Sequence, residues 1–185
     1  MSSTLKYNLV KLSSEGDIPD KILNTPFAEL IRCHNFSSEL KEYNKAELVV
    51  VMCMDNRKQL RVPRKFTYIL RTAGARITGS EFKLSFAIGF ADIKYVALIC
   101  HSQCGMVNLG SKKEKVVSGL IKNAGWTEEE ARNHFDSFAP FFEIENEIDF
   151  VIKESNRLGE KYPKIIFQPF MYEVNDDKLY LIEIN

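Results

Sequence analysis

Two short runs of apolar, largely β-branched residues limit what this chain can fold into. The first run spans residues 47–54 and the second spans residues 95–100. Neither run alternates apolar with polar residues, which is typical of strands that are covered on both faces. Segments with helical spacing lie between and after the runs, so strands and helices alternate along the chain. This alternation predicts a mainly parallel sheet with right-handed crossover connections.

The other elements are expected from apolar periodicity and from turn signals. Thr127 and Glu130 form a capping box, which predicts the start of a long helical region. The apolar spacing of residues 79–91, which includes Phe82, Phe86 and Phe90, predicts a helix that returns to the sheet. Expected helices cover 21–43, 79–91, 112–123 and, with a break near Pro140, 127–158, and expected strands cover 47–54, 66–71, 95–100, 164–174 and 178–184.

We expect one domain, because no repeat, low-complexity stretch or Gly/Ser-rich linker divides the chain. The fold class is α/β: a mainly parallel central sheet of about four strands, flanked by helices. Turn residues at 175–177 predict that the last strand returns as an antiparallel C-terminal edge strand. The single domain covers residues 1–185, with an N-terminal helical arm at 1–46 and the α/β core at 47–185.

Composition excludes some classes of partner. The chain carries 25 Lys+Arg and 25 Asp+Glu, so no net charge attracts it to nucleic acid or to an anionic membrane. Its longest apolar run, residues 48–54, is far shorter than the ~20 residues of a membrane-spanning helix. The amino terminus lacks the apolar core of a signal peptide. We therefore expect a cytoplasmic protein that binds neither nucleic acid nor a membrane.

The four cysteines, in a reducing cytosol, favour metal binding or chemistry over disulfides. Cys100 ends an apolar run and is expected to be a buried structural thiol. Cys33 stands next to His34 in a helical segment, where adjacent residues point in different directions. We therefore do not expect Cys33 and His34 to act as a pair of ligands.

The remaining two cysteines and one histidine stand where a metal site can form. Cys53 ends the first apolar run, His101 follows the second, and Cys104 comes three residues later. In open α/β sheets, sites form outside the carboxyl ends of the strands. Two thiolates and one imidazole give zinc three protein ligands and leave a fourth position open, which is a catalytic arrangement.

An acid and an arginine follow the first of these cysteines. Asp55 and Arg57 stand two and four residues beyond Cys53. As a bidentate pair they would fix the carboxylate beside the metal, whereas a surface ion pair would be worth ~0–1 kcal/mol. Two thiolates cancel the charge on zinc, so the metal alone should acidify water less than it does among neutral ligands. A carboxylate that orients the attacking nucleophile is therefore needed.

Taken together, these motifs resemble the β-class carbonic anhydrases, particularly their compact archaeal-type branch. The motifs are Cys-x-Asp-x-Arg at 53–57, Arg-x-Ala-Gly at 71–74 and His-x-x-Cys-Gly at 101–105, and the similarity extends over residues 47–108 and 170–181. The resemblance implies a zinc enzyme that reversibly hydrates carbon dioxide to bicarbonate by zinc-bound hydroxide. It also implies a homodimer or a higher multiple of dimers, with the N-terminal arm embracing the partner. The zinc ligands it implies are Cys53, His101 and Cys104, and the catalytic pair is Asp55 and Arg57.

The chain also departs from the family pattern. The segment between Cys53 and Arg71 is shorter than usual in the family, and Gln103 stands where compact relatives often carry an acid. These differences are expected to affect the pocket and the substrate more than the zinc ligands. Gly74 and Gly105 are either turn residues or leave room for a small substrate. We expect Arg71 to support the site through hydrogen bonds to the backbone.

Other functions remain open at this point. The same zinc site could hydrolyse carbonyl sulfide or carbon disulfide, and motifs alone do not separate these substrates from carbon dioxide. A non-catalytic, zinc-stabilised regulatory dimer is a further alternative, although it would have no use for the Asp55–Arg57 pair. A nucleotide-binding domain is disfavoured, because no Gly-rich phosphate loop follows the first apolar run.

Overall fold

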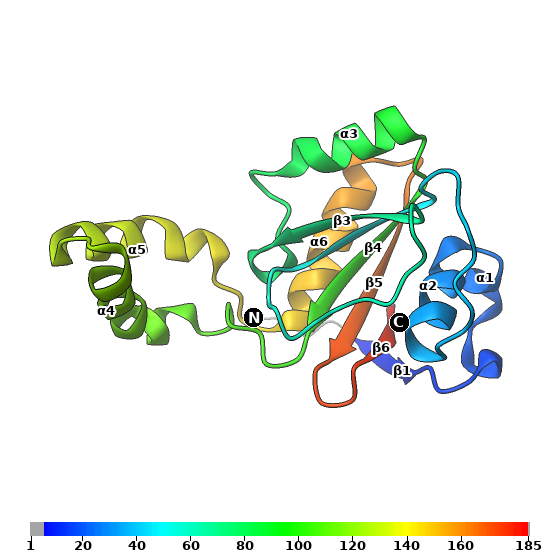
Figure 1. The fold of residues 1–185 in the computed structure, drawn as a ribbon, viewed down its shortest axis with the longest axis horizontal. Coiled ribbons are helices and arrows are strands. Elements are labelled where there is room, and N and C mark those ends of the chain that lie inside the picture. Colours follow the sequence, from blue (N-terminus) through cyan, green and yellow to red (C-terminus); the bar gives the residue numbers. More distant parts are fainter. Residues whose placement is uncertain (1–5, 185) are drawn as a thin grey trace.

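A computed structural model describes residues 6–184 and builds them around a six-stranded sheet (Figure 1). The strand order is β1-β6-β5-β4-β2-β3, with β2 to β5 mutually parallel and the pairs β5–β6 and β6–β1 antiparallel. This arrangement confirms the expected fold class. The strands are β1 (Tyr7–Lys11), β2 (Leu48–Cys53), β3 (Thr67–Thr72), β4 (Tyr95–His101), β5 (Ile166–Glu173) and β6 (Lys178–Ile184).

The two apolar runs form adjacent central strands. Every residue of β2 is buried, as are all residues of β4 after Tyr95. Val51 of β2 lies opposite Leu98 of β4, and Met52 lies opposite Ile99, so the two strands end at the same edge of the sheet. The wholly apolar sequence of these runs follows from this position, because helices cover both faces.

Two layers of helices enclose the sheet (Figure 1). On one face lie α1 and α2, packed against β4 and β6, and on the other lie α3 and α6. The bounds are α1 (Asp20–Leu23), α2 (Pro26–Asn35), α3 (Glu81–Ala91), α4 (Lys113–Ala124), α5 (Glu128–Phe142) and α6 (Glu147–Lys161), with 3-10 turns at Glu15–Asp17, Ala73–Ala75 and Leu109–Lys112.

The segment expected as one helix over residues 21–43 contains two shorter helices. Pro26 opens α2, where the Thr25 side chain accepts a hydrogen bond from the N–H of Phe27, and the helix ends at Asn35. Phe27, Leu30 and Ile31 are buried in the core of this chain. The apolar side chains of this part of the N-terminal arm, which was expected to embrace a partner, therefore cover the chain's own sheet.

Helix α3 is where the sequence placed it, but it packs with a different face. Leu84 and Ala87 are buried against the sheet, whereas Phe82, Phe86 and Phe90 are 80%, 49% and 74% exposed. This helix is apolar on all sides, so periodicity alone does not identify the face that packs. The smaller side chains face the core, and the aromatic stripe faces outward.

Helices α4 and α5 form a hairpin that projects away from the sheet (Figure 1). Gly125, with a φ of +73°, ends α4 in the left-handed conformation, and the expected capping box at Thr127 opens α5. The expected break near Pro140 is present, although α5 includes Pro140 and continues to Phe142. The helical region is interrupted at residues 143–146, where the Asn146 side chain caps the start of α6. The hairpin has its own apolar cluster, which includes Leu109, Val117, Ala131, Phe135 and Ala139.

Strand β1 was not expected from the sequence. It pairs with β6 from Tyr7 opposite Ile184 to Lys11 opposite Tyr180, and it therefore covers the edge that the C-terminal strand would otherwise form. Its five residues are exposed or half-buried, which leaves no clear apolar alternation. Among the described residues, the free edge of the parallel strands is β3.

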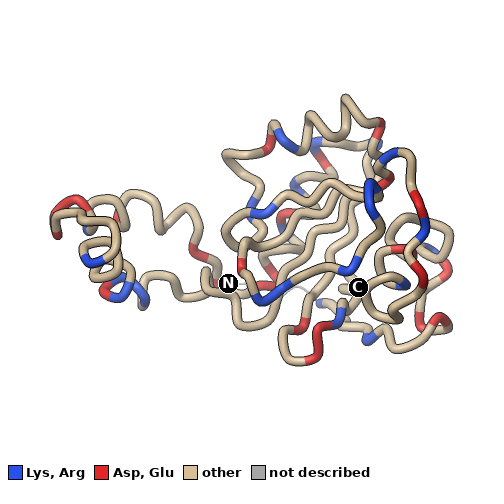
Figure 2. The backbone as a smooth tube through the Cα atoms, viewed as in Figure 1, with Lys and Arg blue, Asp and Glu red and all other residues tan. Residues whose placement is uncertain are grey.

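Charge is mixed over the surface of the molecule. Lysines, arginines and acids are interspersed along the chain, and the projecting hairpin carries both signs (Figure 2). Within residues 6–184, no helix has the length and apolar character that a membrane span requires.

His34 of α2 packs against the sheet through its imidazole ring. Its ring lies 5.4 Å from the ring of Tyr172, and its Nδ1 accepts a hydrogen bond from the N–H of Arg61. Burial lowers the pKa of His34 from 6.5 to about 4. The imidazole is therefore neutral in the folded protein at pH values where it is already protonated in the unfolded chain.

This difference predicts a loss of stability in mild acid. Because the folded pKa lies below the unfolded one, the contribution is fully present above pH 6.5 and is lost as the pH falls toward 4. The loss should approach about 3 kcal/mol at pH 4. Urea unfolding between pH 7 and pH 4 measures this loss as the slope of the free energy of unfolding against pH. His34→Gln should flatten that slope, and the control His134→Gln, at an exposed position, should keep it. An unchanged slope in His34→Gln would contradict the assignment.

Candidate metal centre

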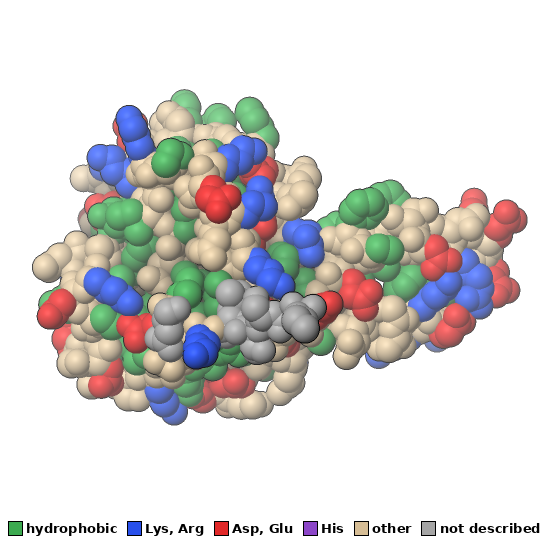
Figure 3. All heavy atoms as spheres, turned by 180° about the vertical axis from the view of Figure 1, so that it is seen from behind, with side chains coloured by type: hydrophobic (Ala, Val, Ile, Leu, Met, Phe, Trp, Pro, Cys, Tyr) green, Lys and Arg blue, Asp and Glu red, His purple; other side chains and the backbone are tan. Residues whose placement is uncertain are grey.

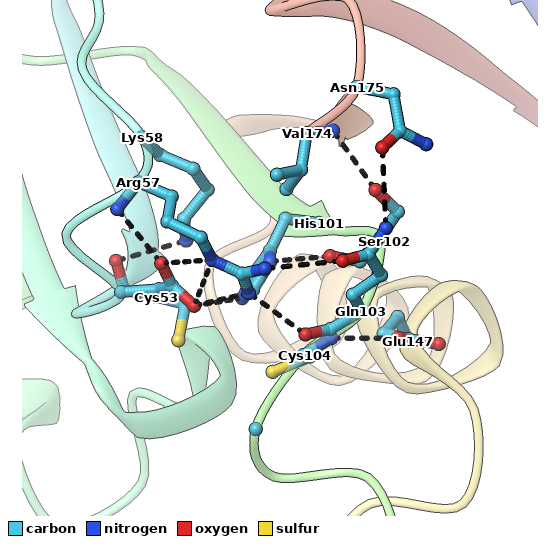
Figure 4. Close-up of polar contacts among 12 residues, drawn as sticks. Cys53, Arg57, Lys58, His101, Ser102, Gln103, Cys104, Glu147, Val174 and Asn175 are labelled. Atoms are coloured by element: carbon cyan, nitrogen blue, oxygen red, sulfur yellow. Dashed lines mark hydrogen bonds and ion pairs between the residues drawn. The ribbon is translucent and has the colours of Figure 1, made fainter.

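Three side chains with metal-binding atoms meet at the carboxyl edge of the sheet. Cys53 is the last residue of β2, His101 is the last residue of β4, and Cys104 lies in the loop after β4. The two sulfur atoms and a ring nitrogen lie within 4.8 Å of one another, and all three residues are buried. The adjacency of β2 and β4 produces this cluster, which Figure 4 shows in close-up.

The imidazole of His101 presents a free lone pair to the cluster. Its Nδ1 lies 2.9 Å from the carbonyl oxygen of Ser102, and because a carbonyl only accepts, Nδ1 carries the proton of the neutral ring. Nε2 is buried and has no hydrogen-bond partner among the described residues. A buried, unpaired acceptor of this kind is unfavourable unless something binds it. Metal-ligating histidines commonly show the same arrangement, with the second ring nitrogen donating to a carbonyl.

The two thiols influence each other's ionisation. The neighbouring Cys104 thiol holds the pKa of Cys53 well below its usual range, and the same contact together with burial raises the pKa of Cys104. The pair therefore favours a state in which one sulfur is a thiolate and the other retains a proton. A cation placed between the sulfurs would remove this asymmetry, since both thiolates could then bind it.

An ion pair flanks the cluster. Arg57 donates from Nε to Asp55 Oδ1 at 3.0 Å and from Nη2 to Oδ2 at 2.7 Å, so the pair is bidentate. These hydrogen bonds hold the pKa of Asp55 well below its usual range. Asp55 Oδ2 lies 4.0 Å from Nε2 of His101, while Arg57 also donates to the backbone carbonyl of Gln103 at 3.0 Å. The carboxylate is thus fixed beside the free ring nitrogen.

Arg71 supports the loop that carries this pair, as the sequence predicted. Its Nη1 donates to the carbonyl oxygens of Cys53 at 3.2 Å and Asp55 at 3.4 Å, and its Nη2 donates to that of Lys58 at 2.8 Å. A guanidinium on β3 therefore ties together both ends of the turn that follows β2. Gly74 has a φ of +62°, and a side chain there would press on Met106. The backbone conformation of this turn therefore explains the glycine without a role in substrate binding.

Two residues at the site were not singled out from the sequence. Lys58 is fully buried, and its Nζ donates to the Cys53 carbonyl at 3.3 Å. Glu147, at the start of α6, accepts a hydrogen bond from the backbone N–H of Cys104 at 3.1 Å. A lysine in a polar loop gives no signal of burial, and Glu147 lay in the expected helical region 127–158 with nothing to mark it as part of a site.

The other cysteines lie apart from the cluster. Cys100 is buried on β4 with its Sγ 3.4 Å from the carbonyl oxygen of Phe170, and burial raises the pKa of its thiol. Cys33 lies buried on α2, where its Sγ is 3.6 Å from Glu29 Oε1. Both fit the structural roles expected of them, and neither contributes to the metal-binding group.

Comparisons with known proteins found similarity in structure only. Neither the protein-family models nor the curated protein sequences match this chain. Among solved structures, a carbonic anhydrase from Glaciozyma antarctica is 21% identical, with a TM-score of 0.58 over 88% of this chain and 98% of that one. A β-carbonic anhydrase isoform from Trichomonas vaginalis is 19% identical, with a TM-score of 0.60 over 86% and 96%.

A carbon disulfide hydrolase in its apo form is also similar. It is 20% identical, with a TM-score of 0.52 over 74% of this chain and 78% of that one. These likenesses concern the fold. The chain has the fold of the β-class carbonic anhydrases.

Proposed function

We propose that this chain is a zinc enzyme that reversibly hydrates carbon dioxide to bicarbonate. The observation that carries the proposal is the buried cluster of Cys53, His101 and Cys104, with the Asp55 carboxylate 4.0 Å from the imidazole. A fold shared with carbonic anhydrases supports it, as does the motif resemblance to their compact archaeal-type branch. We assign the chain to that branch as part of the proposal.

The proposed zinc ligands are Cys53, His101 and Cys104. This donor set suits zinc, and three protein ligands leave a position for a reactant. When bound, zinc supplies a Lewis acid that acidifies a water molecule. His101 contributes a ring orientation fixed by its hydrogen bond to the Ser102 carbonyl.

In the proposed catalytic pair, Asp55 accepts a hydrogen bond and Arg57 holds Asp55 in place. Because Arg57 keeps the pKa of Asp55 low, the carboxylate is ionised and can only accept a hydrogen bond. It can therefore orient the attacking nucleophile toward carbon dioxide. Arg57, held in turn by the Gln103 carbonyl, prevents the carboxylate from turning toward the metal ligands.

A second substrate class is supported by a specific likeness, that to the carbon disulfide hydrolase. Carbon disulfide and carbonyl sulfide are linear cumulated molecules like carbon dioxide, and the same nucleophile can attack them. A protein that binds zinc without turning over any of the three would instead be a regulatory dimer. The assays below distinguish these outcomes.

We also propose a homodimer, or a multiple of dimers, formed through the apolar surface around α3. Phe82, Phe86 and Phe90 form one exposed stripe, and the rings of Phe86 and Phe90 stack 4.9 Å apart. Figure 3 shows apolar side chains over this helix and along the hairpin. A hollow of about 410 Å³ near the start of α3 is lined by apolar residues of α5 that include Phe138 and Phe141.

This surface suits a second copy of the chain. In a two-fold symmetric dimer, the aromatic stripe of each copy can pack into the hollow of the other copy. The neighbouring edge strand β3 is unpaired among the described residues, with Tyr68 and Ile69 exposed. An apolar surface of this kind is normally covered in solution.

A cytoplasmic location completes the proposal. All four cysteines are free and buried, which suits a protein of a reducing compartment. The proposed partners are carbon dioxide, bicarbonate and a second copy of the chain.

The zinc site predicts one zinc ion per chain. Cys53→Ser should lose nearly all of its zinc, because a hydroxyl is a far weaker ligand than a thiolate. Elemental analysis of the purified protein measures this, and Cys33→Ser on α2 should keep the wild-type content. Full zinc content in Cys53→Ser would overturn the site.

The catalytic pair predicts a variant that binds zinc but turns over slowly. Asp55→Asn nearly preserves size but cannot accept through both oxygens, so kcat for carbon dioxide hydration should fall by ~10²–10³. Stopped-flow assays measure it, with Asp136→Asn on the exposed face of α5 as the control.

Two results would change the assignment. Wild-type turnover in zinc-loaded Asp55→Asn would remove Asp55 from the mechanism. A wild-type protein that cleaves carbonyl sulfide but does not hydrate carbon dioxide would make the second substrate class the correct one.

The assembly proposal predicts a mass of at least twice 21.3 kDa at micromolar concentration. Phe86→Glu should shift the protein to monomer, since it places a charge in the apolar contact. Light scattering measures the mass, and Leu40→Glu, at an exposed apolar position away from α3, should remain dimeric. A monomeric wild type would refute the proposal.

A further inference from the structure

Lys58 is a buried cation, and no carboxylate pairs with it within residues 6–184. Its side chain is 0% exposed, and the one hydrogen bond that its Nζ makes among the described residues is to the carbonyl of Cys53. An ammonium group has three protons to donate. Burial of an unpaired charge is strongly unfavourable, and an apolar side chain of similar volume would fill the same space more favourably. The charge itself therefore needs an explanation.

The position of Lys58 connects it with the metal-binding cluster. Figure 4 shows its side chain beside Cys53, at the end of β2. The carbonyl that receives its hydrogen bond also receives one from Arg71 at 3.2 Å. Two cations thus converge on the backbone of a proposed metal ligand.

The charges around the cluster balance except for Lys58. Asp55 is neutralised by Arg57, with which it forms its bidentate pair. Glu147, which approaches the cluster from α6, offsets Arg71, which approaches from β3. Two thiolates offset a divalent metal ion. Lys112, which donates to the Gly105 carbonyl, and Glu173, which accepts from the Ser102 hydroxyl, also carry opposite charges. Among the ionised groups that hydrogen-bond residues 53–58 and 101–105, Lys58 is therefore the one left over, so the loaded site carries an excess of one positive charge.

We propose that the buried ammonium of Lys58 makes the open position of the site select an anion over a neutral molecule. This inference rests on the proposed zinc site and deepens it. With an anion at the open position the site becomes electroneutral, whereas without Lys58 the same anion would leave it negative. Bicarbonate is the anion concerned in the proposed reaction. Because Lys58 acts across the Cys53 backbone rather than by touching the reactant, it is a positioning residue.

Ligand affinity tests this inference without relying on turnover. The full-length protein is loaded with cobalt(II), which has the charge of zinc and a visible spectrum that changes with its ligands. Thiocyanate and neutral imidazole are titrated at constant ionic strength. In Lys58→Met, which keeps the length and volume of the stem, the Kd for thiocyanate should rise about tenfold while that for imidazole changes less than twofold. Lys153→Met, at an exposed position on α6, is the matched control and should bind both as the wild type does.

Each other outcome has a definite meaning. Unchanged thiocyanate affinity in Lys58→Met overturns the inference, and equal weakening of thiocyanate and imidazole overturns it in favour of a packing role. Circular dichroism checks the fold, and if Lys58→Met does not fold, comparison of Lys58→Gln with the charge-retaining Lys58→Arg answers the same question. A wild-type protein that takes up no cobalt overturns the proposed metal site, and this inference falls with it.

Discussion

The parallel pairing of β2 with β4 is the constraint on which the rest of the site depends. Strands that pair in parallel end at the same edge, so the last residues of two segments far apart in sequence become neighbours. Cys53 and His101 are those residues. Burial of both strands between helix layers fixes their register. A slip by one residue would turn every side chain to the opposite face of the sheet, where the helices are not shaped to receive it. Two of the three metal-binding side chains, Cys53 and His101, are therefore positioned by the core, and Cys104 approaches them from the loop after β4.

Much of this could be predicted from the sequence, for reasons visible in particular residues. Cys53 and His101 stand at the ends of apolar runs, where sites form in parallel sheets, and Cys104 follows His101 by three residues. The hydrogen bonds of Arg71 to the backbone were also expected. The structure also places the Asp55–Arg57 pair beside the ring of His101, which spacing alone left open. The roles of these residues remain proposals.

Other features lay beyond the sequence because their signals depend on tertiary context. Phe82, Phe86 and Phe90 are spaced like a packed face, yet the opposite face of α3 meets the sheet. The strand β1 has no apolar alternation and forms only because β6 offers it an edge. Lys58 is indistinguishable from a solvated loop lysine until the turn after β2 folds back over it. In each case, a neighbour that is distant in sequence decides the outcome.

The projecting hairpin is a packing unit of its own. Its apolar cluster around Phe135 is separate from the two that flank the sheet. The hairpin is nevertheless inserted between Cys104 and Glu147, two residues joined by a hydrogen bond at the metal-binding cluster. Together with the backbone bridge between Val107 and Ile144, that hydrogen bond closes the base of the insertion. The Cys104 side of the cluster is therefore tied to the base of the hairpin, whereas the Cys53 side is anchored in the sheet.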